Sequence, residues 1–172
     1  MRECLLIREK TEPDRSLLSR VRRVVERVRE STAVLVNGRP DVAVAAGAAG
    51  VQLPADGLPL VDVRRAFPAP FLIGVSCHAL HELPRAADEG ADFALLAPIY
   101  STSGKEGLRA EALDALPLTA PFPVFALGGL TLERLEAWPR DRRRRIAGVA
   151  GIGLFHGPAE ESARTIRALK EL

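Results

Sequence analysis

Short apolar runs rich in β-branched residues recur along the chain, and polar residues or Gly and Pro follow each run. Runs of this kind predict β-strands. None of them alternates cleanly between apolar and polar positions, so each is expected to be buried on both faces, as in a parallel sheet covered by helices. Seven strands are predicted, over residues 4–7, 33–36, 50–53, 71–75, 93–97, 124–127 and 147–151.

Helical periodicity fills the intervals between these runs. It is clearest over residues 16–29, where apolar side chains recur at helical spacing opposite several arginines. Residues 159–172 place Ala163, Ile166 and Leu169 on one face, and Pro158 suits a first helical position. Further helices are expected over residues 40–46, 60–66, 79–89 and 132–138, with Pro84 delaying or kinking its helix.

Regular alternation of strand and helix with short connections favours either a (βα) barrel or an open doubly wound sheet. No GxGxxG or GxxxxGK[ST] loop follows the first strand, which weakens the dinucleotide and P-loop versions of the open sheet. The sequence therefore predicts an α/β fold of the TIM-barrel type. At 172 residues, one domain over residues 1–172 is expected.

Composition places the chain among ordinary globular proteins, with 47% hydrophobic and 27% charged residues. A net charge of +2 gives no field that would favour nucleic acid or an anionic membrane as partner. Cys4 and Cys77 have no CxxC spacing, so neither a disulfide framework nor a thiolate metal site is indicated. Without a bilayer-length apolar run or a signal peptide, we expect a cytoplasmic protein.

Polar and glycine residues gather where the predicted strands end. In parallel α/β proteins these ends converge on one face and present side chains and backbone amides to a ligand. The combination of cations, hydroxyl groups and glycines found at these ends suits an anion such as phosphate or diphosphate. In chain order the candidate site residues are Arg8, Lys10, Asn37, Gln52, Ser76, His78, Thr102, Lys105, Gly128, Gly129, Gly151, Ile152 and Gly153.

Longer stretches around these positions resemble one known family. They are IREK (7–10), LVNGRPDVAVAAGAAGVQL (35–53), IGVSCH (73–78), GADFALLAPIYSTSGK (90–105), PVFALGGL (123–130) and AGVAGIG (147–153). Together they are similar, in order and spacing, to successive blocks of the thiamine phosphate synthase and TenI-type thiazole tautomerase superfamily. The resemblance covers nearly the whole chain.

The resemblance implies a (βα)8 barrel that holds a thiazole phosphate, with the synthase also binding hydroxymethylpyrimidine diphosphate and magnesium. It implies that the amides around Gly129 and residues 151–153 hold the thiazole phosphate, and that Asn37 contacts the pyrimidine. The residues that it implies for binding of the diphosphate are Arg8, Lys10, Ser76, Thr102 and Lys105. The candidate catalytic residues are Ser76, His78 and Lys105.

The sequence also departs from the family's pattern at three positions. Gly38 follows Asn37 where the synthase has a magnesium-binding aspartate, and Gly57 stands where a second is expected, with Asp56 one residue early. We therefore assign no metal ligand, although Mg²⁺ is the cofactor that the resemblance implies. Pro98 replaces the tautomerase histidine, so His78 is left either as a proton shuttle or as a positional residue.

The N-terminus departs as well. IREK belongs to the family's second strand, so the first strand and helix are expected to be absent, and Leu6 replaces a glutamine that contacts the pyrimidine. Three explanations stay open: the start codon is placed too late, the barrel is open along one seam, or a neighbouring subunit covers the exposed strand edge. A homodimer corresponds to the last of these.

Three hypotheses about function remain. The first is a catalyst of thiamine assembly, either a synthase or a tautomerase-like enzyme, with phosphorylated thiazole and pyrimidine diphosphate as partners. The second is a non-catalytic binder of a phosphorylated ligand. The third is a nucleic-acid module that uses the arginine run 142–145, for which a solvated turn is the favoured interpretation. Trp138 and Cys77 are predicted to be packed residues, and His81 and His156 form no zinc pattern.

Overall fold

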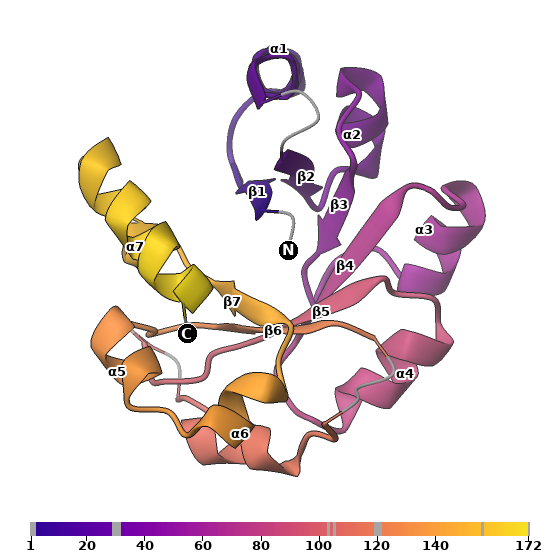
Figure 1. The fold of residues 1–172 in the computed structure, drawn as a ribbon. Coiled ribbons are helices and arrows are strands. Elements are labelled where there is room, and N and C mark those ends of the chain that lie inside the picture. The colour runs from indigo at the N-terminus through magenta and orange to yellow at the C-terminus, as the bar shows by residue number, and fades with distance from the viewer. Residues whose placement is uncertain are drawn as a thin grey trace. The chain divides into compact units, whose positions relative to one another are not determined.

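The computed structural model describes residues 3–28, 32–102, 104, 106–118, 122–155 and 157–171. The chain divides into two compact units, the first made of Met1–Ser76 and Arg85–Asp92 and the second of Cys77–Pro84 and Phe93–Leu172. Both units alternate parallel strands with helices (Figure 1). The predicted α/β class is therefore confirmed, whereas the single barrel domain stays a prediction.

The first unit contains the first four strands in chain order, all parallel. They are β1 (Glu3–Ile7), β2 (Thr32–Asn37), β3 (Gly50–Leu53) and β4 (Leu72–Cys77), and Cys77 already belongs to the second unit. The helices between them are α1 (Asp14–Val28), α2 (Pro40–Ala46) and α3 (Leu60–Ala66). The short helix α4 (Glu82–Asp88) has residues in both units.

The core of the first unit forms where α1 and α2 pack against β2. The helical spacing predicted for residues 16–29 places Leu17 and Val21 of α1 in this core. The buried residues are Leu17, Val21, Val34, Val36, Val42, Ala43 and Ala46. Burial of these side chains supplies the main favourable free energy for this part of the fold.

Strand β1 differs from the prediction that every strand is buried on both faces. Glu3, Cys4 and Leu5 are exposed, with Leu5 at 42%. The prediction is wrong for this strand because β1 is the first strand of the order and, among the described residues, pairs with β2 alone.

The second unit contains three further parallel strands, β5 (Phe93–Leu96), β6 (Val124–Leu127) and β7 (Gly148–Ala150). Its helices are the 3₁₀ segment η2 (Ala110–Ala115), α5 (Leu132–Glu136), α6 (Arg140–Arg144), the 3₁₀ segment η3 (Gly153–Phe155) and α7 (Ala159–Glu171). Buried side chains from the strands and helices form its core, among them Ala94, Leu96, Leu113, Val124, Ala126, Leu135 and Trp138. No helix among the described residues is long and apolar enough to cross a membrane.

The arginine run 142–145 is part of α6 and its end, not the predicted solvated turn. The Arg142 side chain is only 11% exposed and its Nη2 lies 2.7 Å from Asp114 Oδ2. Arg145 donates to the Leu116 carbonyl. The prediction is wrong because the partners of these arginines lie in and directly after η2, far away in sequence. The Arg142 guanidinium hydrogen bond holds the pKa of Asp114 below its usual range.

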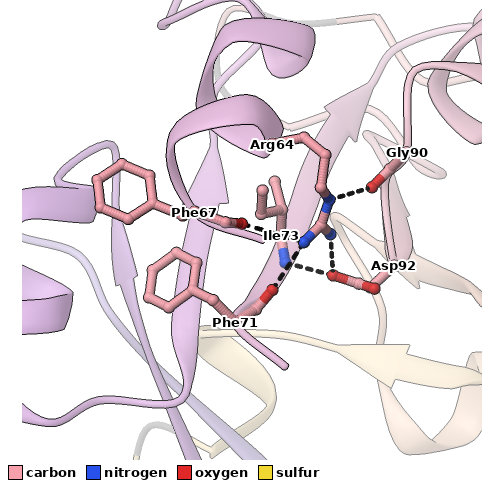
Figure 2. A network of polar contacts seen from close by, with 6 residues as sticks. All are labelled: Arg64, Phe67, Phe71, Ile73, Gly90 and Asp92. Atoms are coloured by element: carbon pink, nitrogen blue, oxygen red, sulfur yellow. Dashed lines mark hydrogen bonds and ion pairs between the residues drawn. The ribbon is translucent and has the colours of Figure 1, made fainter. Parts of the chain in front are cut away.

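One guanidinium joins three segments of the first unit (Figure 2). From α3, Arg64 Nε donates to Gly90 O at 2.9 Å, and Nη1 donates to Phe67 O at 3.3 Å and to Phe71 O at 3.0 Å. These carbonyls belong to turns, where the backbone has no strand or helix partner. Arg64 therefore satisfies acceptors that would otherwise be left without a donor.

Asp92 completes this network. Arg64 Nη2 lies 2.5 Å from Asp92 Oδ2, and the same oxygen accepts the backbone N–H of Ile73 at 2.7 Å. Ile73 lies in β4, so the ion pair also fixes the amino end of that strand. The network lies away from the carboxyl ends of the strands, which gives it a structural role.

We predict that Arg64→Ala lowers the free energy of unfolding by about 3 kcal/mol, because it leaves the Asp92 carboxylate and partly buried carbonyls without their donor. Arg64→Lys should recover little, since an ammonium cannot reproduce the planar set of donors. Urea unfolding measures the free energy of unfolding of each variant and of the parent. The matched control is Arg65→Ala, whose side chain is 76% exposed and which should cost less than about 0.5 kcal/mol. Equal losses in both variants would contradict the structural role of Arg64.

Candidate phosphate site at the strand ends

Three predicted site residues lie together at the carboxyl ends of strands in the first unit. Asn37 is the register neighbour of Gln52, and Gln52 is the register neighbour of Gly74. Ser76 lies two residues beyond Gly74 and therefore on the same face of β4. Gln52 Nε2 donates to Ser76 Oγ at 3.2 Å. The structure thus joins Gln52 to Ser76 and places Asn37 beside them.

Gln52 is the buried member of this group. It is 1% exposed, and its Oε1 has no hydrogen-bond partner among the described residues. Ser76 is half-buried and Asn37 is intermediate as well. Arg8 and Lys10 follow β1 and are exposed, and within the described part of the chain no ion pair neutralises either charge. Two cations, a hydroxyl and an amide are thus available to a ligand of this unit.

His78 lies in the second unit, directly after β4. Its Nδ1 lies 2.5 Å from the carbonyl oxygen of Ala97, and its backbone N–H donates to Glu82 Oε2 at 2.7 Å. A carbonyl only accepts hydrogen bonds, so Nδ1 carries the ring proton and Nε2 is the free acceptor of the neutral ring. The exposed His78 ring therefore has the tautomer that a general base needs.

The segment after β5 forms a closed loop in the second unit. Leu108 N donates to Pro98 O at 2.9 Å and Arg109 N donates to Ile99 O at 2.8 Å, which joins the two ends of the loop. Thr102 is exposed within it. The predicted catalytic residue Lys105 lies outside the described residues.

Gly128 and Gly129 follow β6, and both have positive φ values of 101° and 63°. A Cβ atom on Gly128 would lie 2.7 Å from Pro98 Cβ, and one on Gly129 would lie 2.8 Å from Tyr100 Cβ. The two glycines thus let this turn approach the segment after β5 closely. This packing role holds whether or not their amides also meet a phosphate.

A cluster around Tyr100 supports the same turn, and sequence reasoning missed it. Trp138 Nε1 donates to Tyr100 Oη at 2.7 Å, and the Arg134 guanidinium lies 4.4 Å from the centre of the Tyr100 ring. Arg134 also donates to the carbonyl of Gly129. Trp138 is 3% exposed, which confirms its predicted packing role. Local sequence patterns do not predict the contact between Tyr100 and Trp138, because 38 residues separate them.

Residues 151–153 follow β7, and Ile152 and Gly153 lie at an open surface, whereas Gly151 is intermediate. Ile152 is 72% exposed, and a Cβ atom on Gly153 would meet nothing within 4 Å. Their backbone can therefore be approached by a ligand.

Cys77 takes no part in this chemistry. It is 3% exposed, as predicted, and burial followed by the charge of Glu82 raises its pKa to about 11. At neutral pH the thiol is protonated and is a poor nucleophile.

The residues at the two expected magnesium positions do not fit a metal. Gly38 has a φ of 67°, and its N–H donates to Gln52 O at 2.8 Å. Gly57 closes a turn onto Pro54 O at 2.9 Å, and a Cβ atom there would lie 2.9 Å from Pro54 Cδ. Across the described ranges, no group of three or more His, Cys, Asp or Glu residues is arranged to hold a metal ion.

Parallel strands that alternate with helices in both units define an α/β protein. Residues 2–153 match the family model described as thiamine monophosphate synthase. The chain belongs to this family, which confirms the resemblance seen in the sequence.

Individual relatives agree with this membership. The chain is 39% identical to the thiamine-phosphate synthase of Methanoculleus marisnigri, over 96% of this chain and 80% of that protein. It is 35% identical to a putative thiamine-phosphate synthase of Geobacter sulfurreducens, with the same coverage of 96% and 80%. Enzymes of this name are transferases.

One solved structure agrees with the family assignment, and a second agrees with the fold. The thiamine phosphate pyrophosphorylase from Pyrococcus furiosus superimposes with a TM-score of 0.81 at 25% identity, over 98% of this chain and 81% of that chain. A structure described as native KDPGal has a TM-score of 0.65 at 17% identity, with 99% and 93% covered, and supports the fold alone.

We predict that Gly129→Ala lowers the free energy of unfolding by about 2 kcal/mol, because the methyl group meets Tyr100 and the positive φ is strained. Gly153→Ala is the matched control, since open space surrounds it, and it should stay within about 0.5 kcal/mol of the parent. Thermal unfolding followed by circular dichroism measures both. A Gly129→Ala protein as stable as Gly153→Ala would show that the close approach to Tyr100 imposes no constraint.

Proposed function

We propose that this protein binds a phosphorylated thiazole and couples it to hydroxymethylpyrimidine diphosphate, the reaction of a thiamine-phosphate synthase. One observation carries the proposal. The family match over residues 2–153 includes every candidate ligand residue from Arg8 to Gly153. The described arrangement supports it, since these residues follow or end parallel strands.

The phosphate of the thiazole is assigned to backbone amides of the second unit. Ile152 and Gly153 are open to solvent, and Gly128 and Gly129 form a tight turn whose carbonyls accept from Tyr100 N and from Arg134. With the carbonyls held in this way, amides of the turn are available to an anion.

In the first unit, the diphosphate is assigned to Arg8, Lys10 and Ser76, and the pyrimidine to Asn37. Thr102 and Lys105 are diphosphate contacts that the family resemblance alone implies. In the coupling, the lone pair of the thiazole nitrogen forms a bond to the pyrimidine methylene carbon. The bond from that carbon to oxygen breaks, and diphosphate leaves with the electron pair. Negative charge therefore grows on the diphosphate, and fixed cations and hydroxyl donors stabilise it.

His78 has no proton to move in this coupling. Its Nε2 base suits the second candidate function, in which a tautomerase-like protein moves a proton on the thiazole or a binder retains the ligand without turnover. The glycines at positions 38 and 57 favour this candidate over coupling. The proline at position 98 replaces the tautomerase histidine and, within this candidate, favours a binder without turnover. No step is assigned to magnesium, because the described residues at its expected positions do not fit it.

The nucleic-acid hypothesis is weaker than either of these. Arg142 and Arg145 of the arginine run are engaged by Asp114, Glu111 and the Leu116 carbonyl. A homodimer and a cytoplasmic location stay predictions.

Calorimetric titration with the thiazole phosphate tests the proposal, with thiamine phosphate followed in the same samples after hydroxymethylpyrimidine diphosphate is added. We expect binding and product. A chelator should leave the affinity for thiazole phosphate unchanged, because backbone amides provide that site. Binding without product would replace the synthase by the second candidate, and no binding would overturn both.

His78→Gln separates the two candidates. The variant should retain coupling within about twofold, since no proton moves in that step, whereas a proton transfer on the thiazole would fall by about a hundredfold or more. Proton exchange into the bound thiazole, followed by NMR in deuterated water, provides the second measurement. Loss of coupling in His78→Gln, with thiazole phosphate still bound, would contradict a coupling mechanism in which His78 moves no proton.

A further inference from the structure

The contact between Gln52 and Ser76 has a defined hydrogen-bond direction. Gln52 Nε2 lies 3.2 Å from Ser76 Oγ and 3.5 Å from the carbonyl oxygen of Leu53. A carbonyl oxygen only accepts, so the group that faces both oxygens is the amino group of the amide. Gln52 is therefore the donor, and the Ser76 oxygen is the acceptor.

This direction decides what the Ser76 hydroxyl can do. A serine hydroxyl has one hydrogen to donate, and the Ser76 oxygen already receives a hydrogen bond. In the described part of the chain no hydrogen bond uses the hydrogen of Ser76, which is therefore left to donate to an acceptor. Ser76 is half-buried, so a ligand can reach it, whereas Gln52 behind it is 1% exposed.

The burial of Gln52 in this position costs free energy. Its Oε1 is buried, and no described residue donates to it. A buried amide with an unpartnered oxygen costs free energy that an apolar side chain of the same size would avoid. Gly74, the register neighbour of Gln52 on β4, has no side chain, which leaves the amide a path toward Ser76. A role for the amide in orienting Ser76 accounts for both features.

We propose that Gln52 is a positioning residue that keeps the Ser76 hydroxyl as a hydrogen-bond donor to an oxygen of a diphosphate-type anion. The inference rests on the proposed function for its ligand class, and it assigns Gln52 an action through Ser76 instead of a direct contact. The specific claim is that Gln52 affects anion binding only while Ser76 is present.

A double-mutant cycle on the full chain tests this claim, with inorganic diphosphate as the probe and calorimetry as the measurement. Gln52→Met keeps the size and removes the amide, and Ser76→Ala removes the hydroxyl. We expect Ser76→Ala to weaken diphosphate binding about tenfold and Gln52→Met about fivefold. The double variant should bind like Ser76→Ala alone, because the amide has nothing left to orient.

Gln52→Glu adds a readout that a merely structural role would not move. As a carboxylate it accepts the Ser76 hydrogen and turns it away from the ligand, so diphosphate binding at about pH 8 should fall more than about tenfold. As a protonated acid it again donates to Ser76 Oγ, so affinity relative to the parent should recover as the pH is lowered. Burial favours the protonated form. Should this variant fail to fold, the Gln52→Met cycle decides alone, and thermal unfolding checks each protein.

The outcomes separate this inference from the proposed function. Non-additive losses in the cycle support the inference even if no thiamine phosphate is formed. The inference is overturned if the losses in diphosphate affinity of the two single variants are additive in the double variant. It is also overturned if Gln52→Met binds diphosphate like the parent. The proposed function still holds in either case if thiamine phosphate is formed. If the parent protein binds neither diphosphate nor thiazole phosphate, both are overturned.

Discussion

The position of the first unit's site depends on the guanidinium of Arg64. It donates to carbonyls of residues 67, 71 and 90 and pairs with Asp92, which in turn accepts the N–H of Ile73. Turn carbonyls and a carboxylate that are removed from water without a hydrogen-bond partner cost free energy, so this arrangement has few alternatives. It fixes the start of β4, and β4 in register with β3 brings Ser76 to Gln52 at the other end. A structural contact at one end of a strand thus determines the geometry of the candidate chemistry at the other.

Glycines at the strand ends have two different consequences for function. After β6 they allow close packing against Tyr100, which orders the turn whose amides we assign to phosphate. At positions 38 and 57 they replace carboxylates that the family resemblance implies, and there the backbone itself forms the turn. The protein therefore retains the groups suited to an anion, whereas the described residues offer no magnesium site of the family's kind. Because of this contrast, both coupling and binding without turnover are compatible with the site.

Much of the fold could be predicted from the sequence, because apolar runs bounded by Gly and Pro define the strands locally. The strands at 50–53 and 124–127 and the helices at 40–46 and 60–66 have the predicted bounds. Helix α4 begins at Glu82, three residues later than predicted, with Pro84 in its first turn. The helix at the arginine run was missed because its acidic partners, Glu111 and Asp114, lie about 30 residues earlier.

The candidate site was predicted only as a set of residues at strand ends. Which of them touch, and in which direction a hydrogen bond runs, depends on strand register and burial, as the pair Gln52 and Ser76 shows. A crystal structure with thiazole phosphate and diphosphate bound tests the account most directly. We expect a diphosphate oxygen about 2.7 Å from Ser76 Oγ and the thiazole phosphate on the amides of residues 151–153. Either anion bound instead at the arginine run 142–145, with the Ser76 hydroxyl uncontacted, would contradict it.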